Sequence, residues 1–427
     1  MDTFIAKLKA IWNTKELRNS ILFVLGMLVI FRVAAHIPIP GINIANLRSF
    51  FASNQIFGLL NLFSGGTMEN FSVVMLGVAP YITASIILQL LTMIIPRMEE
   101  LSKEGEHGQR VINQWTRYLA VPLAFLQAYG TITLLENSSL PIIENMSALR
   151  LFIIMLTVTA GTLFLVWIGE LISEKKIGNG ISLLIFAGII AGLPGTLRNA
   201  FVTFDRSQLI NMVLFGVVVL ITIIGVVILN EGQRKIPISH ARQIGGGRIA
   251  GGVQTHLPLR VNIAGVIPII FAISVILFPP MLAQFFLRAK SQWLVDAAQW
   301  VIAVFQDQLV YGVLYFVMVF GFTYFYTNVI FHPDQVAENL QKQGAFIPGI
   351  RPGTETARYL GKISARILLF GGLFLAIIAV LPLTLQQVTG SSSLVIGGTS
   401  ILIVVSVAIE TAKQIEAQLT MREYDRL

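Results

Sequence analysis

Cysteine is absent from this 427-residue chain, and charged side chains are scarce. The absence of cysteine excludes disulfides, thiolate metal sites and a cysteine nucleophile. Charged residues make up only 12% of the chain, hydrophobic residues make up 55%, and the mean hydropathy is +0.76. So few charges cannot cover the surface of a water-soluble protein of this size. We therefore interpret the chain as a membrane protein that crosses the bilayer several times.

Long apolar runs occupy most of the sequence, and ten of them are candidates to cross a hydrocarbon core of about 30 Å. The first run follows Lys15 and Arg18 as a signal peptide would, but nine more runs follow it, so we expect a retained helix. The sequence predicts an all-α membrane protein with ten transmembrane helices. The runs lie at about 20–37, 71–95, 118–135, 151–172, 181–197, 209–229, 262–282, 309–331, 366–385 and 394–412.

Lysine and arginine indicate the orientation of these spans. Ten spans place both termini on one side of the membrane, and basic residues accumulate in cytoplasmic loops. A cytoplasmic N-terminus puts 23 of the 30 basic residues on the cytoplasmic side. We therefore expect cytoplasmic N- and C-termini. The orientation of the spans and the anionic lipid at the cytoplasmic surface explain the net charge of +8, so no nucleic-acid partner is needed to explain it.

Two six-residue patterns recur in the two halves of the chain. GVAPYI at 77–82 matches GVIPII at 265–270, and GISLLI at 180–185 matches GTSILI at 398–403. Five spans in each half would make the halves enter the membrane from opposite sides, as inverted repeats do. We predict an N-terminal half at 1–200, a C-terminal half at 201–413 and a cytoplasmic tail at 414–427.

Ionisable side chains are nearly missing from the spans, although ion-coupled transporters and pumps place them there. Of the 22 carboxylates only Glu170 and Glu410 touch a span, each near its cytoplasmic end, and the histidines lie at span edges or in loops. The sequence has no metal-ligand cluster, acid–base relay or intramembrane protease pattern, so we expect no enzymatic activity, metal or cofactor. Gly, Pro, Ser, Thr, Asn and Gln in the spans indicate helices that face protein or water.

The segment FGLLNLFSGG at 57–66 is apolar but too short to span the membrane, since Gly65 and Gly66 end it after about 15 Å of helix. Such a segment is tolerated at membrane depth only inside a protein-lined cavity. We interpret it as a mobile stopper of a pore. The alternative is an amphipathic helix that lies on the outer leaflet.

Several longer motifs stand out along the chain: HIPIPG (36–41), NLFSGG (61–66), PYITASIILQLL (80–91), IGNGIS (177–182), AGLP (191–194), THLPLRVNIAGVIP (255–268), GAFIPGIRPG (344–353) and GGTSILIVV (397–405). With these motifs the chain resembles bacterial SecY, from near Leu17 to about Lys413. The resemblance implies a protein-conducting channel of the bacterial cytoplasmic (inner) membrane. It also implies an hourglass pore, which a plug closes on the outer side. The pore would open sideways to lipid between the second and seventh spans.

Partners follow from the same resemblance. It implies binding of SecE, SecG, the motor SecA, the ribosome, signal sequences and nascent polypeptides, within membrane lipid. The motor or the ribosome would supply the energy, and no small-molecule substrate is implied. The competing class is a small-solute transporter, which would have buried charge and short loops. The large cytoplasmic loops at 231–261 and 331–365 favour the channel.

The pore constriction is predicted on two grounds. A ring of aliphatic side chains deforms around a passing chain and dewets when empty. The repeated patterns end at four isoleucines, and the resemblance puts these four and two neighbours in the ring, whereas the alternative is ordinary packing on helix faces. The predicted ring is Val78, Ile82, Ile181, Ile185, Ile270 and Ile403.

The resemblance also implies a plug, a lateral gate and a partner-binding surface. For the gate, the alternative is ordinary packing amides. For the basic residues, the alternative is that they only set the orientation of the chain in the membrane. Arg351 stands in a turn that Pro348 and Pro352 stiffen. The plug is assigned to about 57–70, with Phe57, Leu60, Phe63, Ser64 and Gly65; the gate to Thr83, Gln89, Gln127 and Asn262; the SecA or ribosome contacts to Arg242, Arg248 and Arg351.

Overall fold

The computed structural model places a helix over each of the ten predicted apolar runs. It describes residues 9–53, 61, 64–136, 141–143, 147–202, 209–240, 244–245, 248–249, 254–287, 289–389 and 392–424. The long helices are α2 (Lys15–Ala34), α5 (Ala79–Ile94), α7 (Glu106–Glu136), α8 (Ala148–Glu174), α9 (Gly180–Val202), α10 (Leu209–Glu231), α11 (Ile267–Phe286), α13 (Gln308–Ile330), α15 (Thr354–Thr389) and α16 (Ser392–Tyr424).

Six helices in the described part of the chain are long and apolar enough to cross a membrane, or seven if the bent pair of α5 and α6 counts as one span. The apolar stretches Gly180–Gly195 and Gly216–Glu231, on α9 and α10, are shorter than a full span. The shorter helices are α3 (Ile44–Ser53), α6 (Pro96–Lys103), α12 (Gln292–Gln306) and α14 (Pro333–Lys342).

Proline and capping side chains set several helix boundaries. Pro96 begins α6 directly after α5, and the chain bends by 104° there. Proline fits the first helical turn because its missing N–H would have no partner at that position. The Oδ1 atom of Asp307 accepts hydrogen bonds of 2.9 Å from the backbone N–H groups of Leu309 and Val310, which caps α13. Asp307 therefore marks the start of α13, directly after α12 ends at Gln306.

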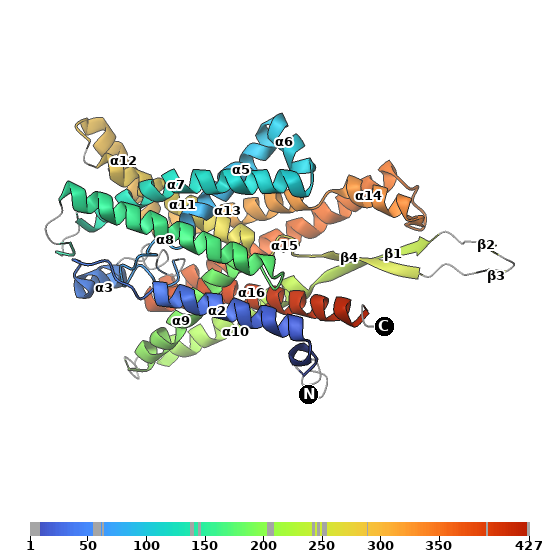
Figure 1. Ribbon diagram of the computed structural model, residues 1–427, viewed down its shortest axis with the longest axis horizontal. Coiled ribbons are helices and arrows are strands. Elements are labelled where there is room, and N and C mark those ends of the chain that lie inside the picture. Colours follow the sequence, from blue (N-terminus) through green and yellow to red (C-terminus); the bar gives the residue numbers. More distant parts are fainter. Residues whose placement is uncertain are drawn as a thin grey trace.

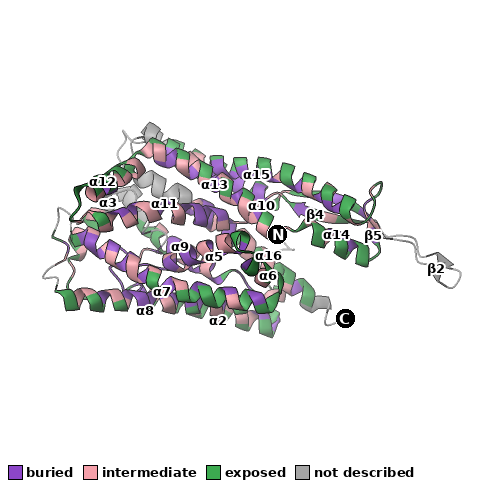
Figure 2. Ribbon diagram, turned by 90° about the horizontal axis from the view of Figure 1, so that it is seen from above, coloured by how far each residue is buried: buried purple, intermediate pink, exposed green. Residues whose placement is uncertain are grey.

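The long helices form two groups that follow the sequence. In the first half α7 contacts α5 and α8, while α8 and α9 contact α2; in the second half α15 contacts α13, α10 and α16. The groups meet where α11 contacts α5 and α7, and where α16 contacts α9. Figure 2 shows exposed residues on the outward faces of α15, α8 and α2, and buried residues on helices between them such as α5 and α9.

The two ends of the molecule differ (Figure 1). One end, which we call the hairpin end, carries α6, α14 and an antiparallel hairpin of β1 (Gln233–His240) and β4 (Gln254–Arg260). Gln233 pairs with Arg260 and Ser239 with Gln254, and the short strand β5 (Ala345–Phe346) pairs with the other edge of β1. The opposite end, which we call the α3 end, carries α3 and α12. The predicted loops 231–261 and 331–365 therefore contain regular structure.

Candidate functional site

The recurring G-V-x-P-x-I pattern has the same backbone conformation in both halves. Gly77 has φ +58° and Gly265 has φ +65°, a left-handed conformation that glycine adopts without a steric penalty. Each is followed by a valine N-cap and by a proline in the first turn, of α5 and α11 respectively. Figure 1 shows that α5 leads to α6 at the hairpin end, whereas α11 leads to α12 at the α3 end. The two copies therefore run in opposite directions, as inverted repeats require.

The second pattern also matches in its buried positions. Ser182 and Ser400 are both buried, as are the isoleucines three residues after each, Ile185 and Ile403. Gly180 begins α9 in close contact with Gly169, where a methyl group would overlap the backbone carbonyl oxygen. The corresponding stretch in the second half lies inside α16 instead of at a helix start. The two copies of the pattern therefore share their buried serine and isoleucine positions, whereas they differ in where the helix begins.

The predicted ring residues all belong to the large hydrophobic cluster that joins the two halves. Five of them are buried, and Ile181 is partly buried and packs against the same cluster. They come from the start of α5, from α9, from the first turn of α11 and from α16. One continuous hydrophobic cluster thus contains predicted ring residues of both halves, with Val78, Ile82 and Ile185 from the first half and Ile270 and Ile403 from the second.

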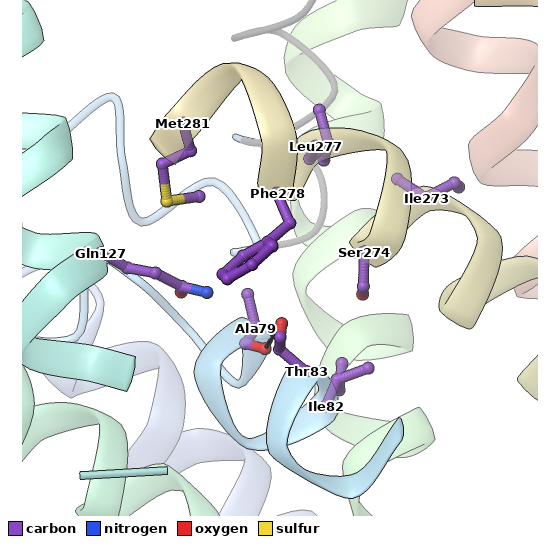
Figure 3. Close-up of a pocket in the computed structure, with 9 residues that line it drawn as sticks. All are labelled: Ala79, Ile82, Thr83, Gln127, Ile273, Ser274, Leu277, Phe278 and Met281. Atoms are coloured by element: carbon purple, nitrogen blue, oxygen red, sulfur yellow. Dashed lines mark hydrogen bonds between the residues drawn. The ribbon is translucent and has the colours of Figure 1, made fainter. Parts of the chain in front are cut away.

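A pocket lies between α5, α7 and α11, at the junction of the two halves (Figure 3). Its polar lining consists of Thr83, Gln127 and Ser274, one residue from each helix. The other lining residues are Ala79, Ile82, Ile273, Leu277, Phe278 and Met281. In Figure 3 the Gln127 side chain points across the gap toward Phe278 and α5. This pocket marks the seam that the sequence assigns to the side gate.

The predicted gate residues fall into two places. Thr83 and Gln127 line the seam, where the Thr83 hydroxyl donates to the Ala79 carbonyl oxygen (3.1 Å) and the Gln127 side chain is 2% exposed. Gln89 donates to the Ser85 hydroxyl within α5 (3.2 Å). The amide oxygens of Gln89 and Gln127 lack a hydrogen-bond partner among the residues that the structure describes. These two buried amides therefore leave hydrogen-bonding capacity unused, which lowers their contribution to the stability of the packed helices.

Asn262 does not line the seam pocket but lies in the segment just before α11. Its side-chain amide donates to the Asn230 side-chain oxygen at 2.7 Å and to the Gly265 carbonyl oxygen at 3.1 Å. Asn230 in turn donates to the Ser406 hydroxyl (3.3 Å), and Lys413 donates to the Asn230 carbonyl oxygen (2.8 Å). These partners lie on α10, α16 and the segment before α11, so the structure places Asn262 in a network inside the second half.

Aromatic contacts across the seam were not identified from the sequence. Tyr129 on α7 stacks on Phe285 on α11, with ring centroids 5.0 Å apart. A methyl group added at Gly130 would lie 3.0 Å from the Phe285 ring, so the small residue admits the aromatic side chain. This pair had no signal in the sequence, because the pairing depends on the register between α7 and α11.

The predicted plug is described only in part. Phe57, Leu60 and Phe63 lie outside the described residues. Ser64 and Gly65 are buried in a turn, where the Ser64 hydroxyl donates to the Asn61 carbonyl oxygen (2.9 Å). This turn lies against α2 and α9, since Gly65 contacts Phe31 and Gly188. The described part of the segment is therefore packed between helices of the first half and not laid on the surface.

Two of the three basic residues predicted to bind a partner, Arg248 and Arg351, lie among the described residues. Arg351 is exposed in the turn between β5 and α15, beside a pocket that Arg358 and Lys362 also line. Arg358 makes an ion pair of 2.9 Å with Glu355. On α14, the hydrogen bond from Lys342 holds the pKa of the Glu338 carboxyl below its usual value. Arg248 lies on the short strand β3 (Arg248–Ile249), and Arg242 lies outside the described residues.

Sequence comparison identifies the relatives of this chain. The protein translocase subunit SecY of Mycobacterium tuberculosis (strain H37Rv) is 44% identical over 445 residues, which cover 100% of this chain and 99% of the relative. The protein of the same name from Halalkalibacterium halodurans is 43% identical over 424 residues, covering 97% of each chain. The protein of that name from Corynebacterium glutamicum is 45% identical over 441 residues, covering 96% and 97%.

Solved structures share the fold. One described as "The structure of a protein conducting channel" has a TM-score of 0.64 at 19% identity and covers 92% of this chain and 91% of its own. The canine Sec61 in a ribosome–channel complex has a TM-score of 0.61 at 18% identity, covering 92% and 91%. At these identities the likeness shows the fold alone. The family model SecY matches residues 72–412, most of the chain. The chain is therefore a member of the SecY family.

Proposed function

We propose that this chain is the central subunit of a Sec protein translocation channel, through which unfolded secretory polypeptides cross the cytoplasmic membrane. The curated relatives bear the name protein translocase subunit SecY. The observation that carries the proposal is the meeting of matched aliphatic residues from two inverted halves in one buried cluster. The chain is a channel subunit and not an enzyme, so it lowers the barrier to passage without making or breaking bonds.

The ring supplies the seal. Isoleucine and valine side chains pack together when the pore is empty and exclude water, which stops ions by dewetting. They also deform around side chains of any size, and they offer no charge that would bind one sequence and arrest it. Ile82, Ile185, Ile270 and Ile403 meet these needs because they are aliphatic and come from four different helices. When a polypeptide passes, the ring side chains contact the polypeptide instead of one another.

The seam between α5, α7 and α11 supplies the side exit. Its polar groups are few, and each interhelical polar contact in a membrane is worth only about 0.6 to 2 kcal/mol. An apolar signal helix that enters the seam gains more than this by burying its own surface in lipid. Transmembrane segments would therefore leave sideways between α11 and the pair α5 and α7, while soluble segments continue through the ring.

The hairpin end supplies the docking surface for the energy source. Arg351, Arg358 and Lys362 present cationic groups around one pocket, which suits the carboxylates of the motor SecA or the phosphates of ribosomal RNA. We assign this end to the cytoplasm, with both termini, and the α3 end to the outer face of the inner membrane. The small subunits SecE and SecG complete the complex, and the halves 1–200 and 201–413 move relative to one another at the seam.

A reconstitution experiment tests the proposal. The chain is purified with its small subunits, placed in proteoliposomes, and supplied with the motor, ATP and a secretory precursor carrying a signal sequence. We expect the precursor to become protected from external protease, and protection to vanish without ATP. Uptake of small solutes with no protection of any precursor would contradict the proposal and support a solute transporter.

A further inference from the structure

The turn at residues 64–66, within the proposed plug, is held against α2 and α9 by specific contacts. We propose that Arg32 on α2 and Gly188 on α9 are the positioning residues that latch this turn in the closed state. The inference rests on the proposed channel function, because a latch has meaning only if the segment moves. It concerns two residues that the sequence did not assign to the plug or to the gate.

Arg32 provides the polar half of the latch. It lies in the last turn of α2, directly after the apolar stretch 21–31 of that helix, and its guanidinium donates to the Gly65 carbonyl oxygen at 3.0 Å. A guanidinium within a membrane helix is costly unless it finds an acceptor, and hydrogen bonds from charged donors are stronger than neutral ones. The bond therefore satisfies the charge and ties the turn to α2. Release of the turn would leave the guanidinium to find another acceptor.

Gly188 provides the packing half of the latch. A methyl group added to Gly188 would overlap the Cα atom of Gly65, so two glycine backbones touch directly. Gly65 has φ +77°, which other residues rarely adopt, and a methyl group there would lie 2.9 Å from the Phe31 ring and 3.0 Å from the Gly188 Cα atom. Neither position tolerates a side chain while the turn is seated. The fit between α9 and the turn thus depends on glycine on both sides.

The turn is braced internally and so moves as one body. The Gly66 N–H donates to the Asn61 carbonyl oxygen at 2.7 Å, and the Thr67 hydroxyl lies 2.9 Å from the Ser64 carbonyl oxygen and 3.1 Å from that of Met75. Among the described residues, the turn is held from outside by the Arg32 hydrogen bond and the Phe31 ring on α2, by the Gly188 backbone on α9 and by the close approach of Gly77 to Ser64. The hydrogen bond and the Gly188 contact hold the turn to two separate helices, so weakening either one favours its release without unfolding it.

The first test removes the charged hydrogen bond. Arg32→Met keeps an unbranched apolar stem but removes the donors, and Arg32→Lys restores a charged donor. Arg48→Met is the matched control, because Arg48 lies on α3 at the same end and donates to Asn70 (3.0 Å) instead of the turn. We expect the resting ion conductance of the complex in planar bilayers to rise about tenfold in Arg32→Met, with partial recovery in Arg32→Lys and no change in Arg48→Met.

The second test fills the contact with α9. Gly188→Ala collides with the turn, whereas Gly192→Ala, one turn further along α9, adds a methyl group with nothing within 4 Å. We expect Gly188→Ala alone to raise the conductance. A readout independent of ions is available because the chain has no cysteine. A single Ser64→Cys substitution places a thiol in the buried turn, and we expect a membrane-impermeant maleimide to label it faster when Gly188→Ala or Arg32→Met is present.

The outcomes separate the latch from the channel function. Raised conductance and labelling with precursor translocation intact support the latch. Conductance and labelling at parental levels in both Arg32→Met and Gly188→Ala would overturn it, provided that the complex still assembles and translocates. Failure of the unsubstituted complex to translocate any precursor would instead overturn the proposed function. If Arg32→Met fails to assemble, the Arg32→Lys variant and the maleimide labelling in Gly188→Ala decide whether the latch exists. If Gly188→Ala fails to assemble, the labelling in Arg32→Met decides it.

Discussion

Gly77 and Gly265 adopt the same left-handed backbone conformation at the start of α5 and α11, helices that run in opposite directions. Both glycines turn the chain so that a valine caps the helix and an isoleucine follows in the first turn, at Ile82 and Ile270. Yet their surroundings differ. A methyl group at Gly77 would lie 2.8 Å from the Ser64 Cα atom, whereas one at Gly265 meets only the Glu410 carboxylate at 3.6 Å.

This difference predicts unequal effects of the same substitution. Gly77→Ala and Gly265→Ala each incur about 1 to 2 kcal/mol of backbone strain in the left-handed region. Gly77→Ala also pushes on the turn that bears Ser64, so we expect it alone to raise resting conductance. Thermal unfolding of the two complexes should show similar losses of stability from the strain. Equal conductance of the two variants would contradict the assignment of the Ser64 turn to the plug.

At the seam, Gln127 offers a test of the gate. Its side-chain oxygen is buried without a hydrogen-bond partner among the described residues, and its neighbours Phe278 and Met281 are apolar. Replacing an unsatisfied polar group by an apolar one of similar size is neutral or stabilising. We therefore expect Gln127→Leu to stabilise the closed seam and to reduce export of precursors with weak signal sequences. Increased export of those precursors would contradict this.

Asn262 should behave differently from Gln127. Asn262→Leu deprives Asn230 of its 2.7 Å donor inside the second half, which costs about 1 to 3 kcal/mol for an acceptor left unsatisfied. We expect a lower unfolding temperature for the complex, measured by a thermal shift, and little change in the preference for strong over weak signal sequences. A changed preference with unchanged stability would show that Asn262 acts at the gate after all.

The loop arginine is tested by charge reversal. Arg351→Glu replaces an exposed cation beside Arg358 and Lys362 with an anion, so it should repel the carboxylates or phosphates of a docking partner. We expect motor-driven export to be lost while membrane insertion and assembly persist. Arg110→Glu is the control, because Arg110 is also exposed but pairs with Glu106 on α7 (2.9 Å). Normal export by Arg351→Glu would remove this residue from the docking surface.

Hydropathy and symmetry predicted much of this architecture. The ten apolar runs coincide with helices because long apolar runs have one stable solution in a bilayer, with every backbone group bonded within the segment. The isoleucines of the repeated patterns were predicted together because inversion places matched positions at the same depth. These features depend on local sequence and on symmetry, so no knowledge of side-chain packing was needed.

The features that the sequence did not reveal depend on contacts between distant segments. The hairpin of β1 and β4 was treated as a loop, since its pairing of Gln233 with Arg260 joins residues that a glycine-rich stretch separates. The resemblance implied a gate role for Asn262, but its hydrogen bond with Asn230 depends on how α10 packs and had no signal in the sequence. The contact of Gly65 with Gly188 was likewise invisible before the fold was known.

The most direct test of the central claim is site-specific crosslinking of a polypeptide stalled in the channel. Single cysteines replace Ile82, Ile185, Ile270 and Ile403 in turn, with Ile224 (57% exposed) and Val317 (55% exposed) as controls on outward helix faces. We expect each of the four ring positions to crosslink to the stalled chain and neither control to do so. Two or more silent ring positions, or crosslinks from the controls as strong as those from the ring, would contradict it.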